Sequence, residues 1–119
     1  MEKVSLEEKF GRFKEFWSPK IVGELNGQYV KLVKVKGEFV WHQHEHEDEL
    51  FFVCKGRLTI QFRERRVVLE EGEFLVVPAG VEHKPVAEEE AHVLLFEPKP
   101  TLNTGNVRNE RTIANLEQI

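Results

Sequence analysis

The sequence contains almost no cysteine. Cys54 is the single cysteine among 119 residues, so the chain cannot form an internal disulfide, and a disulfide framework is excluded as its source of stability. A chain of this length can bury a hydrophobic core without such cross-links. We therefore expect one folding unit in a reducing compartment, and we predict a cytoplasmic protein. Cys54 lies between "FFV" and "KG", which predicts a buried strand residue without a catalytic role.

Long hydrophobic runs are absent as well. No segment approaches the roughly 20 apolar residues that a membrane-spanning helix needs. The first 20 residues, "MEKVSLEEKFGRFKEFWSPK", alternate charged with aromatic residues and lack the apolar stretch of a signal peptide. We expect neither membrane association nor export.

An excess of basic residues is also missing. Lysine and arginine number 17 against 21 acidic residues, which leaves a formal charge of −4. No stretch interleaves basic with aromatic residues in the way that a nucleic-acid-binding surface does. Nucleic acid is therefore not an expected partner.

One short amphipathic helix is predicted in an N-terminal segment, residues 1–19. Ser5 precedes Glu8 by three positions, which is the spacing of a capping box. Apolar residues follow at helical spacing, at Leu6, Phe10, Phe13 and Trp17. Pro19 ends this pattern.

Residues 20–97 have the pattern of short strands separated by turns. Asn26-Gly27 joins "KIVGEL" to "QYVKLVKVK", which is a strong hairpin signal. Further turns are indicated at Gly37, Gly56 and Gly72. Eight or nine strands without intervening helices predict an all-β barrel or sandwich.

Several of these strands are apolar at successive positions, namely "ELFFVC", "FLVV" and "VLLF". Both of their faces must therefore be covered. One face would line the interior of the barrel, and the other requires a second sheet, a terminal helix or a second subunit. We favour a homodimer.

The last segment, residues 98–119, begins with two prolines and continues as "TLNTGNVRNERTIANLEQI". Its pattern predicts a loop and a final short helix capped by Asn109 or Thr112. We interpret "LNTGN" as a plain turn before that helix, although it could fold over the mouth of the barrel.

Histidines and acids are concentrated in "VWHQHEHEDELFFVCKG", residues 40–56. If "EFVWHQH" is a strand, His42 and His44 point to the same side. Glu49 then begins the next strand, and a distant histidine, His83, follows a Pro-x-Gly turn. Three imidazoles and one carboxylate suit Fe, Mn, Co, Ni or Zn, whereas Mg or Ca prefers oxygen ligands alone.

These residues resemble the two signature motifs of the cupin superfamily. The first motif is matched at His42, His44, Glu49 and Gly56, and the second at Gly72, Pro78, Gly80 and His83. The short gap between the motifs is similar to that of small prokaryotic single-domain cupins often labelled mannose-6-phosphate-isomerase-like. The resemblance implies an antiparallel jelly-roll barrel, commonly dimeric, with one divalent metal held by His42, His44, Glu49 and His83.

Two positions depart from the family pattern. The first motif usually opens with a glycine six positions before its first histidine; Lys36 stands there, with Gly37 beside it. The second motif usually ends in asparagine four positions after its histidine, where this chain has Ala87. We expect all four ligand positions to be filled, but no polar side chain from position 87 near the cavity.

The remaining candidates in and near this region are assigned simpler roles. His46 is expected in an exposed turn, together with Glu45, Glu47 and Asp48. His92, in the apolar strand "AHVLLF", is interpreted as a core or interface histidine in preference to an acid or base in the cavity. An apolar cavity is predicted from Phe39, Phe51, Val53, Phe62 and Phe74, with only some of them facing inward.

Two classes of function remain open. An octahedral metal with four protein ligands keeps two positions for water or a chelating substrate. It could then act as a Lewis acid in isomerisation, epimerisation or hydrolysis, or activate dioxygen. We favour a small metal-dependent enzyme acting on a small carbonyl or sugar-like metabolite. The alternative is a non-catalytic binding or sensor cupin, because no base besides the ligands is apparent.

Overall fold

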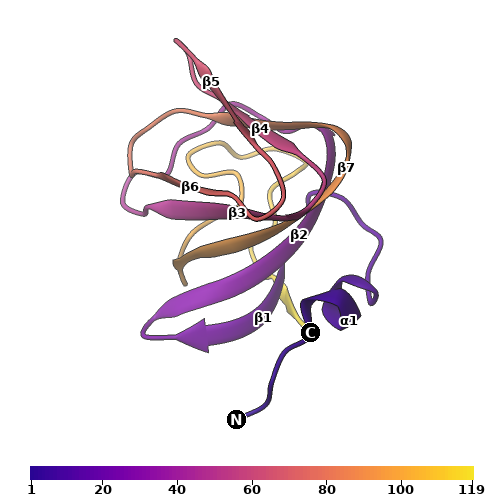
Figure 1. Ribbon diagram of the computed structural model, residues 1–119. Coiled ribbons are helices and arrows are strands. Elements are labelled where there is room, and N and C mark those ends of the chain that lie inside the picture. The colour runs from indigo at the N-terminus through magenta and orange to yellow at the C-terminus, as the bar shows by residue number, and fades with distance from the viewer.

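Strands dominate the structure, a computed structural model that describes residues 1–119. The elements are α1 (Leu6–Phe10), β1 (Lys20–Leu25), β2 (Gln28–Glu38), β3 (Glu49–Lys55), β4 (Leu58–Gln61), β5 (Arg66–Leu69), β6 (Phe74–Val77), β7 (Lys84–Pro98) and β8 (Glu117–Gln118). The strands curl around a common interior as a jelly roll (Figure 1). The prediction of an all-β fold is confirmed. No helix combines the length and hydrophobicity needed to cross a membrane.

The long strand β7 organises the sheet. One edge of β7 pairs with β2 over nearly its whole length, from Gln28 opposite Pro98 to Glu38 opposite Val86. Its other edge pairs first with β4 and then with β3, which itself pairs with β6. β7 therefore begins next to His83 and ends near the first residue of β3. It forms one wall of the interior in which the predicted site lies (Figure 1).

Alternation along the strands builds the core. In β3, Glu49, Phe51 and Val53 are buried, while the residues between them are half-buried. The inward residues of β2, β4 and β7 join Phe51 and Val53 in one cluster of 12 buried apolar residues. Fully burying one such side chain contributes about 1.5–3 kcal/mol. The predicted inward face of β3, with Glu49 at its start, is confirmed.

The N-terminal helix is present but shorter than the apolar spacing predicts. The Ser5 hydroxyl accepts a hydrogen bond from the Glu8 backbone N–H at 3.2 Å, as expected of the cap. The helix ends at Phe10, and the chain beyond it runs beside β2. There the Trp17 N–H donates to the Lys34 carbonyl at 2.8 Å, with Trp17 at a φ of 58°. Pairing with β2 thus replaces the helical turns expected before Pro19.

The predicted C-terminal helix is wrong. Residues 98–119 form turns and the two-residue strand β8, which pairs in parallel with β1. The two expected helix caps close a local turn instead. The Asn109 side chain accepts a hydrogen bond from the Arg111 N–H at 2.8 Å, and the Thr112 hydroxyl accepts one from the Asn109 N–H at 3.0 Å. Such local side-chain bonds compete with helix formation. The chain ends beside α1 (Figure 1).

Candidate metal centre

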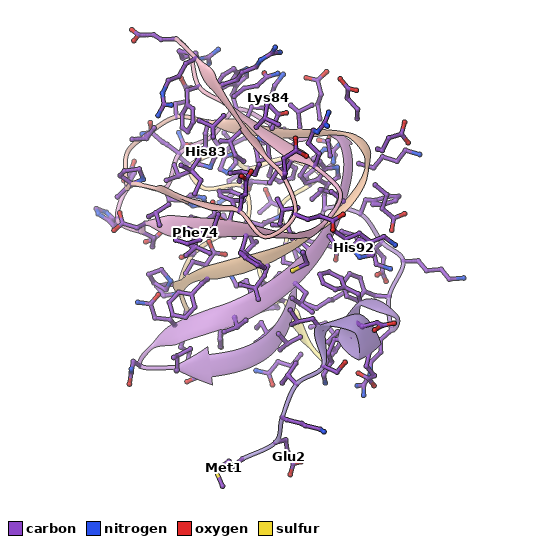
Figure 2. The ribbon with its side chains drawn as sticks, in the orientation of Figure 1. Met1, Glu2, Phe74, His83, Lys84 and His92 are labelled. Atoms are coloured by element: carbon purple, nitrogen blue, oxygen red, sulfur yellow. The ribbon has the colours of Figure 1, made fainter.

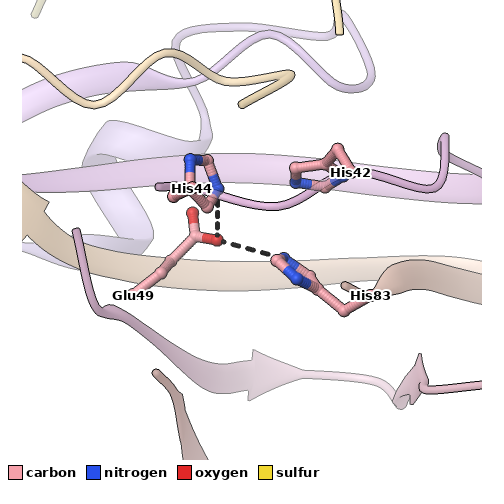
Figure 3. A group of neighbouring side chains, drawn as sticks. All are labelled: His42, His44, Glu49 and His83. Carbon is pink, nitrogen blue, oxygen red and sulfur yellow. Dashed lines mark ion pairs between the residues drawn. The ribbon is translucent and has the colours of Figure 1, made fainter. Parts of the chain in front are cut away.

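The four predicted ligands come together inside the barrel. Each of His42, His44, Glu49 and His83 offers one atom that lies within 4.8 Å of the others, and all four residues are buried. Figure 3 shows the three imidazoles and the carboxylate facing one another. They come from three separate segments, so the site forms only when the sheet is complete.

A backbone bridge, not a strand, positions His42. The expected strand through "EFVWHQH" ends at Glu38, where the left-handed φ of Gly37 accompanies an irregularity in the pairing with β7. Beyond it, the His42 N–H donates to the His83 carbonyl at 3.0 Å, and the His83 N–H donates to the His42 carbonyl at 2.9 Å. These two hydrogen bonds hold the imidazoles of His42 and His83 next to each other without a continuous strand.

His44 is held by the turn that precedes His83. Its carbonyl accepts a hydrogen bond from the Gly80 N–H at 2.7 Å. Gly80 has a φ of 82°, a left-handed conformation that glycine adopts without steric cost. The Pro-x-Gly turn of the second motif therefore orients a ligand of the first motif as well as introducing its own.

Hydrogen bonds set the tautomers of two histidines. The Nδ1 atoms of His42 and His83 lie 2.9 Å from the carbonyl oxygens of Val40 and Val81, respectively. A carbonyl can only accept, so each Nδ1 carries the proton and each Nε2 keeps a free lone pair. This arrangement of a backbone carbonyl behind a histidine is typical of metal ligands.

Several of the converging atoms are buried without a hydrogen bond. They are both ring nitrogens of His44, Glu49 Oε1 and His83 Nε2. Glu49 Oε1 lies 3.2 Å from His44 Nε2 and 3.5 Å from His83 Nε2, contacts that are charged only if an imidazole is protonated (Figure 3). Buried polar atoms are rarely left unsatisfied in this way. The donor set and its unpaired atoms fit a bound metal ion.

The surroundings keep two of these groups in the form that binds a metal. Burial, followed by the proximity of His83, lowers the pKa of His42 to about 4. Burial alone would raise the pKa of Glu49, but the neighbouring His44 and His83 imidazoles outweigh it and hold that pKa well below its ordinary value. Near neutral pH, His42 is therefore neutral and Glu49 is ionised, as metal coordination requires.

Two buried residues next to this site escape the motif analysis. Lys31 and Glu97 form an ion pair at 2.7 Å, and each side chain is 1% exposed. Burial, and next the Glu49 carboxylate, raise the pKa of Glu97 well above its ordinary value. The alternation places both residues at inward positions beside apolar residues, but it does not show that they pair with each other.

A small cavity adjoins His42 and Glu49. Its volume is about 40 Å³, and its walls are largely apolar, with Trp17, Phe39, Phe51 and Val93 among them. The expectation of an apolar cavity is therefore confirmed for Phe39 and Phe51. Phe74 is one of the residues that do not face inward: it is 61% exposed on the outside of the sheet, and the inward residues of β6 are Leu75 and Val77.

The "LNTGN" segment folds against the site, so its interpretation as a plain turn is wrong. The Asn106 N–H donates to the Gln43 carbonyl, and the Gln43 N–H donates to Asn106 Oδ1, both at 2.9 Å. A Cβ on Gly105 would lie 2.2 Å from the Gln43 carbonyl oxygen, so the two segments approach at a distance that only glycine allows. Asn103 lines the cavity itself. Backbone partners on both segments make this contact possible.

The other candidates lie outside the site, as predicted. The His46 side chain is 84% exposed in its turn. Asp48 is exposed and accepts a hydrogen bond from the Ala79 N–H at 2.8 Å, which ties this turn to the one before His83. His92 stacks on Phe10 of α1, with ring centroids 4.6 Å apart (Figure 2). It does not line the cavity beside His42 and Glu49.

Cys54 lies in β3, as predicted, but it is half-buried where a buried residue was expected. Burial raises the pKa of its thiol, which disfavours the reactive thiolate. Ala87 is 1% exposed in the core and contributes no polar group.

An antiparallel jelly roll that encloses two neighbouring histidines, a glutamate and a later histidine is the arrangement of a cupin fold. The family model of the cupin domain matches residues 29–97, which is more than half of the chain. The protein therefore belongs to the cupin family.

Individual relatives agree with this assignment. A cupin-2 domain containing protein from Shewanella frigidimarina is 47% identical, with a TM-score of 0.80 over 81% of this chain and 94% of that chain. Protein NMB1881 from Neisseria meningitidis is 31% identical, with a TM-score of 0.76 over 82% of this chain and all of that one (100%). The uncharacterized protein YdbB of Bacillus subtilis is 38% identical over 64 residues, which are 53% of this chain and 57% of YdbB.

Proposed function

We propose that the protein binds one divalent transition metal per chain through His42, His44, Glu49 and His83, and acts on a small carbonyl or sugar-like metabolite. The observation that supports this proposal is the convergence of four buried side chains whose facing atoms lack hydrogen bonds. Nitrogen and oxygen donors in this ratio suit Fe, Mn, Co, Ni or Zn. Family membership supports the same conclusion, because the match to the cupin domain covers all four residues.

A metal in this site would supply Lewis-acid chemistry to a carbonyl or enediol, or would bind dioxygen if it is redox-active. The chain's own contribution is to prepare the ligands and exclude water. Glu49 is ionised and His42 is neutral, so neither has to lose a proton near neutral pH. The apolar walls around them keep the local dielectric low, which strengthens electrostatic interactions at the site.

The cavity limits the size of the ligand. A volume of about 40 Å³ admits only a small group beside His42 and Glu49. Asn103 is polar, but its side-chain amide donates to the Arg111 carbonyl at 2.7 Å and accepts from the Ile113 N–H at 2.9 Å. It therefore fixes the tail and has little capacity left for a ligand. Small metabolites that bind through the metal suit this cavity best.

One observation favours a non-catalytic binding or sensor protein as the second candidate. Among the residues lining the cavity, only His42 and Glu49 are titratable, and both are assigned to the metal. An enzyme of the isomerase or hydrolase type needs a further group, or a metal-bound water, to move a proton. A sensor has no such need.

A screen of the metal-loaded and metal-free protein distinguishes these functions. Melting temperatures would be measured against a library of small carbonyl acids and sugars, because a ligand of the folded state raises its stability. The proposal expects compounds that stabilise only the loaded protein. Those compounds are then followed by NMR: turnover supports the enzyme, and unchanged ligand supports the sensor. Stabilisation that does not depend on metal would contradict both.

We also propose that the protein forms a homodimer through the outer face of β3 and β6. Phe74 and Val76 are 61% and 46% exposed. The pairing of the strands places them opposite Phe52 and Leu50, which are half-buried. Together these four residues form an apolar patch of a kind that favours a protein partner. The self-complementary geometry of a twofold dimer would cover the patch on both copies.

A further inference from the structure

A row of three ionisable side chains leads through the barrel interior to the metal centre. Lys31 Nζ lies 2.7 Å from Glu97 Oε1. β3 and β7 are antiparallel, and Leu50 lies opposite Phe96. Glu49, which precedes Leu50, therefore lies opposite Glu97, which follows Phe96. Glu49 Oε1 and Glu97 Oε2 are both buried without a hydrogen-bond partner. Lys31, Glu97 and Glu49 thus form a continuous chain of contacts.

This row is unusual in its surroundings. Lys31 and Glu97 are each 1% exposed. Their inward neighbours along the same strands are apolar: Val33 on β2 and Leu95 on β7. Burying a lysine and a glutamate costs desolvation free energy that their mutual attraction does not reliably recover. Two apolar side chains would fill the same space without this desolvation cost. We therefore expect Lys31 and Glu97 to have a role beyond packing.

The contacts of Glu97 indicate that role. One carboxyl oxygen, Oε1, is held by Lys31, while Oε2 is buried and receives no N–H donor. Glu97 does not line the cavity, so it is not placed to touch a substrate. The functional group within its reach is the Glu49 carboxylate, whose Oε1 faces His44 and His83.

We propose that Glu97 and Lys31 are positioning residues of the metal centre. Lys31 fixes the Glu97 carboxyl group, and Glu97 fixes the Glu49 carboxylate with Oε1 directed at the facing imidazoles. This inference rests on the metal site proposed above. Groups that orient a metal ligand from behind typically change metal affinity by about 10–100-fold when removed.

Cobalt(II) provides a direct test, because its visible absorption reports the ligand geometry. The full-length, metal-free protein would be titrated with Co²⁺, and affinity measured by competition with a chromophoric chelator. We expect Glu97→Ala and Lys31→Met to bind Co²⁺ about 10–100-fold more weakly and with altered absorption bands. Glu97→Gln should recover much of the affinity, because its amide keeps the shape of the carboxyl group and can donate to Glu49.

Two further variants separate this role from a structural one. Lys20 is a second buried lysine, and its Nζ lies 3.0 Å from Glu117 Oε1, away from the site. Lys20→Met should change the melting temperature at most and leave the cobalt spectrum unchanged. The double variant Lys31→Met, Glu97→Leu replaces the ion pair by apolar groups, which buried pairs often tolerate without loss of stability. The double variant should fold, and it should bind Co²⁺ about as weakly as the single variants do.

The outcomes are distinct. If the wild type binds no Co²⁺, the metal site itself is wrong and this inference falls with it. If the wild type binds and the folded double variant has the same affinity and absorption spectrum, the positioning role is overturned while the metal site stands. Weaker binding with a changed spectrum in the double variant, but not in Lys20→Met, supports the role.

Discussion

His42 and His83, far apart in the sequence, are locked together by reciprocal backbone hydrogen bonds of 3.0 and 2.9 Å. Their rings lie 4.3 Å apart between centroids. Because the bridge uses main-chain atoms only, the separation of these imidazoles does not depend on either side chain. A substitution at one histidine should therefore remove a ligand without displacing the other.

Metal content should follow the four assigned residues. We expect purified wild-type protein to hold close to one transition metal per chain, and His44→Ala or His83→Ala to hold almost none, because each variant loses one of four donors. Elemental analysis after gel filtration measures this. His46→Ala is the matched control, since His46 is exposed and lies two positions from His44. Full metal retention in both ligand variants would disprove the assignment.

The stability of the metal-free protein should depend on pH through His42. Its pKa is about 4 in the folded protein against an ordinary value of 6.5, so the unfolded chain binds this proton more readily. The stability that neutral His42 provides is complete above pH 6.5 and is lost as the pH falls towards 4. The difference corresponds to about 3 kcal/mol.

This contribution is measured against a His42→Gln variant by urea denaturation at several pH values. Glu97, with its raised pKa, changes stability in the opposite sense, because its proton is held more tightly in the folded state. Both proteins contain Glu97, so the comparison cancels its effect. We expect the wild type to lose stability relative to the variant between pH 6.5 and 4. Parallel pH profiles would show that His42 is not held neutral.

Gly105→Ala should detach the tail from the site. The new methyl group would lie 2.2 Å from the Gln43 carbonyl oxygen, and such overpacking costs about 1–3 kcal/mol. We expect lower stability in urea and faster proteolysis within residues 98–119. Gly72→Ala is the control, because Gly72 also has a left-handed φ but no atom near the added Cβ. Equal losses in the two variants would attribute the effect to backbone strain alone.

Charged residues on the apolar patch should separate the proposed dimer. Phe74→Glu combined with Val76→Glu would oppose like charges across a twofold interface, so we expect a monomer by light scattering while the wild type is a dimer. Leu25→Glu serves as a control, because Leu25 is 45% exposed but lies on β1, outside the patch. A wild-type protein that is monomeric at high concentration would end the proposal.

The sequence predicts this site well because its signals are local. Ligand types at fixed spacing, and turn residues such as Gly80, indicate that His42, His44, Glu49 and His83 can meet, and the structure places them together. Their role as ligands stays a prediction. The Lys31 and Glu97 pair depends on which strands are neighbours and in what register, and a single strand pattern does not contain that information.

The errors have a similar origin. The spacing in residues 98–119 suits a helix, but Asn109 and Thr112 use their side chains to close a local turn. Likewise, "EFVWHQH" has the alternation of a strand, yet its pairing stops at Glu38. In both cases a local preference was overruled by hydrogen bonds that only the folded chain makes available.

The tail allows the site to be altered without altering the metal ligands. Residues 98–119 reach the site through two hydrogen bonds between Asn106 and Gln43 and are tied to the sheet by the two-residue strand β8. Segments held by so few bonds open at lower free energy than a core strand does. A change in this tail alone would therefore enlarge the cavity while His42, His44, Glu49 and His83 keep their positions, so the shape of the cavity can vary independently of the proposed ligands.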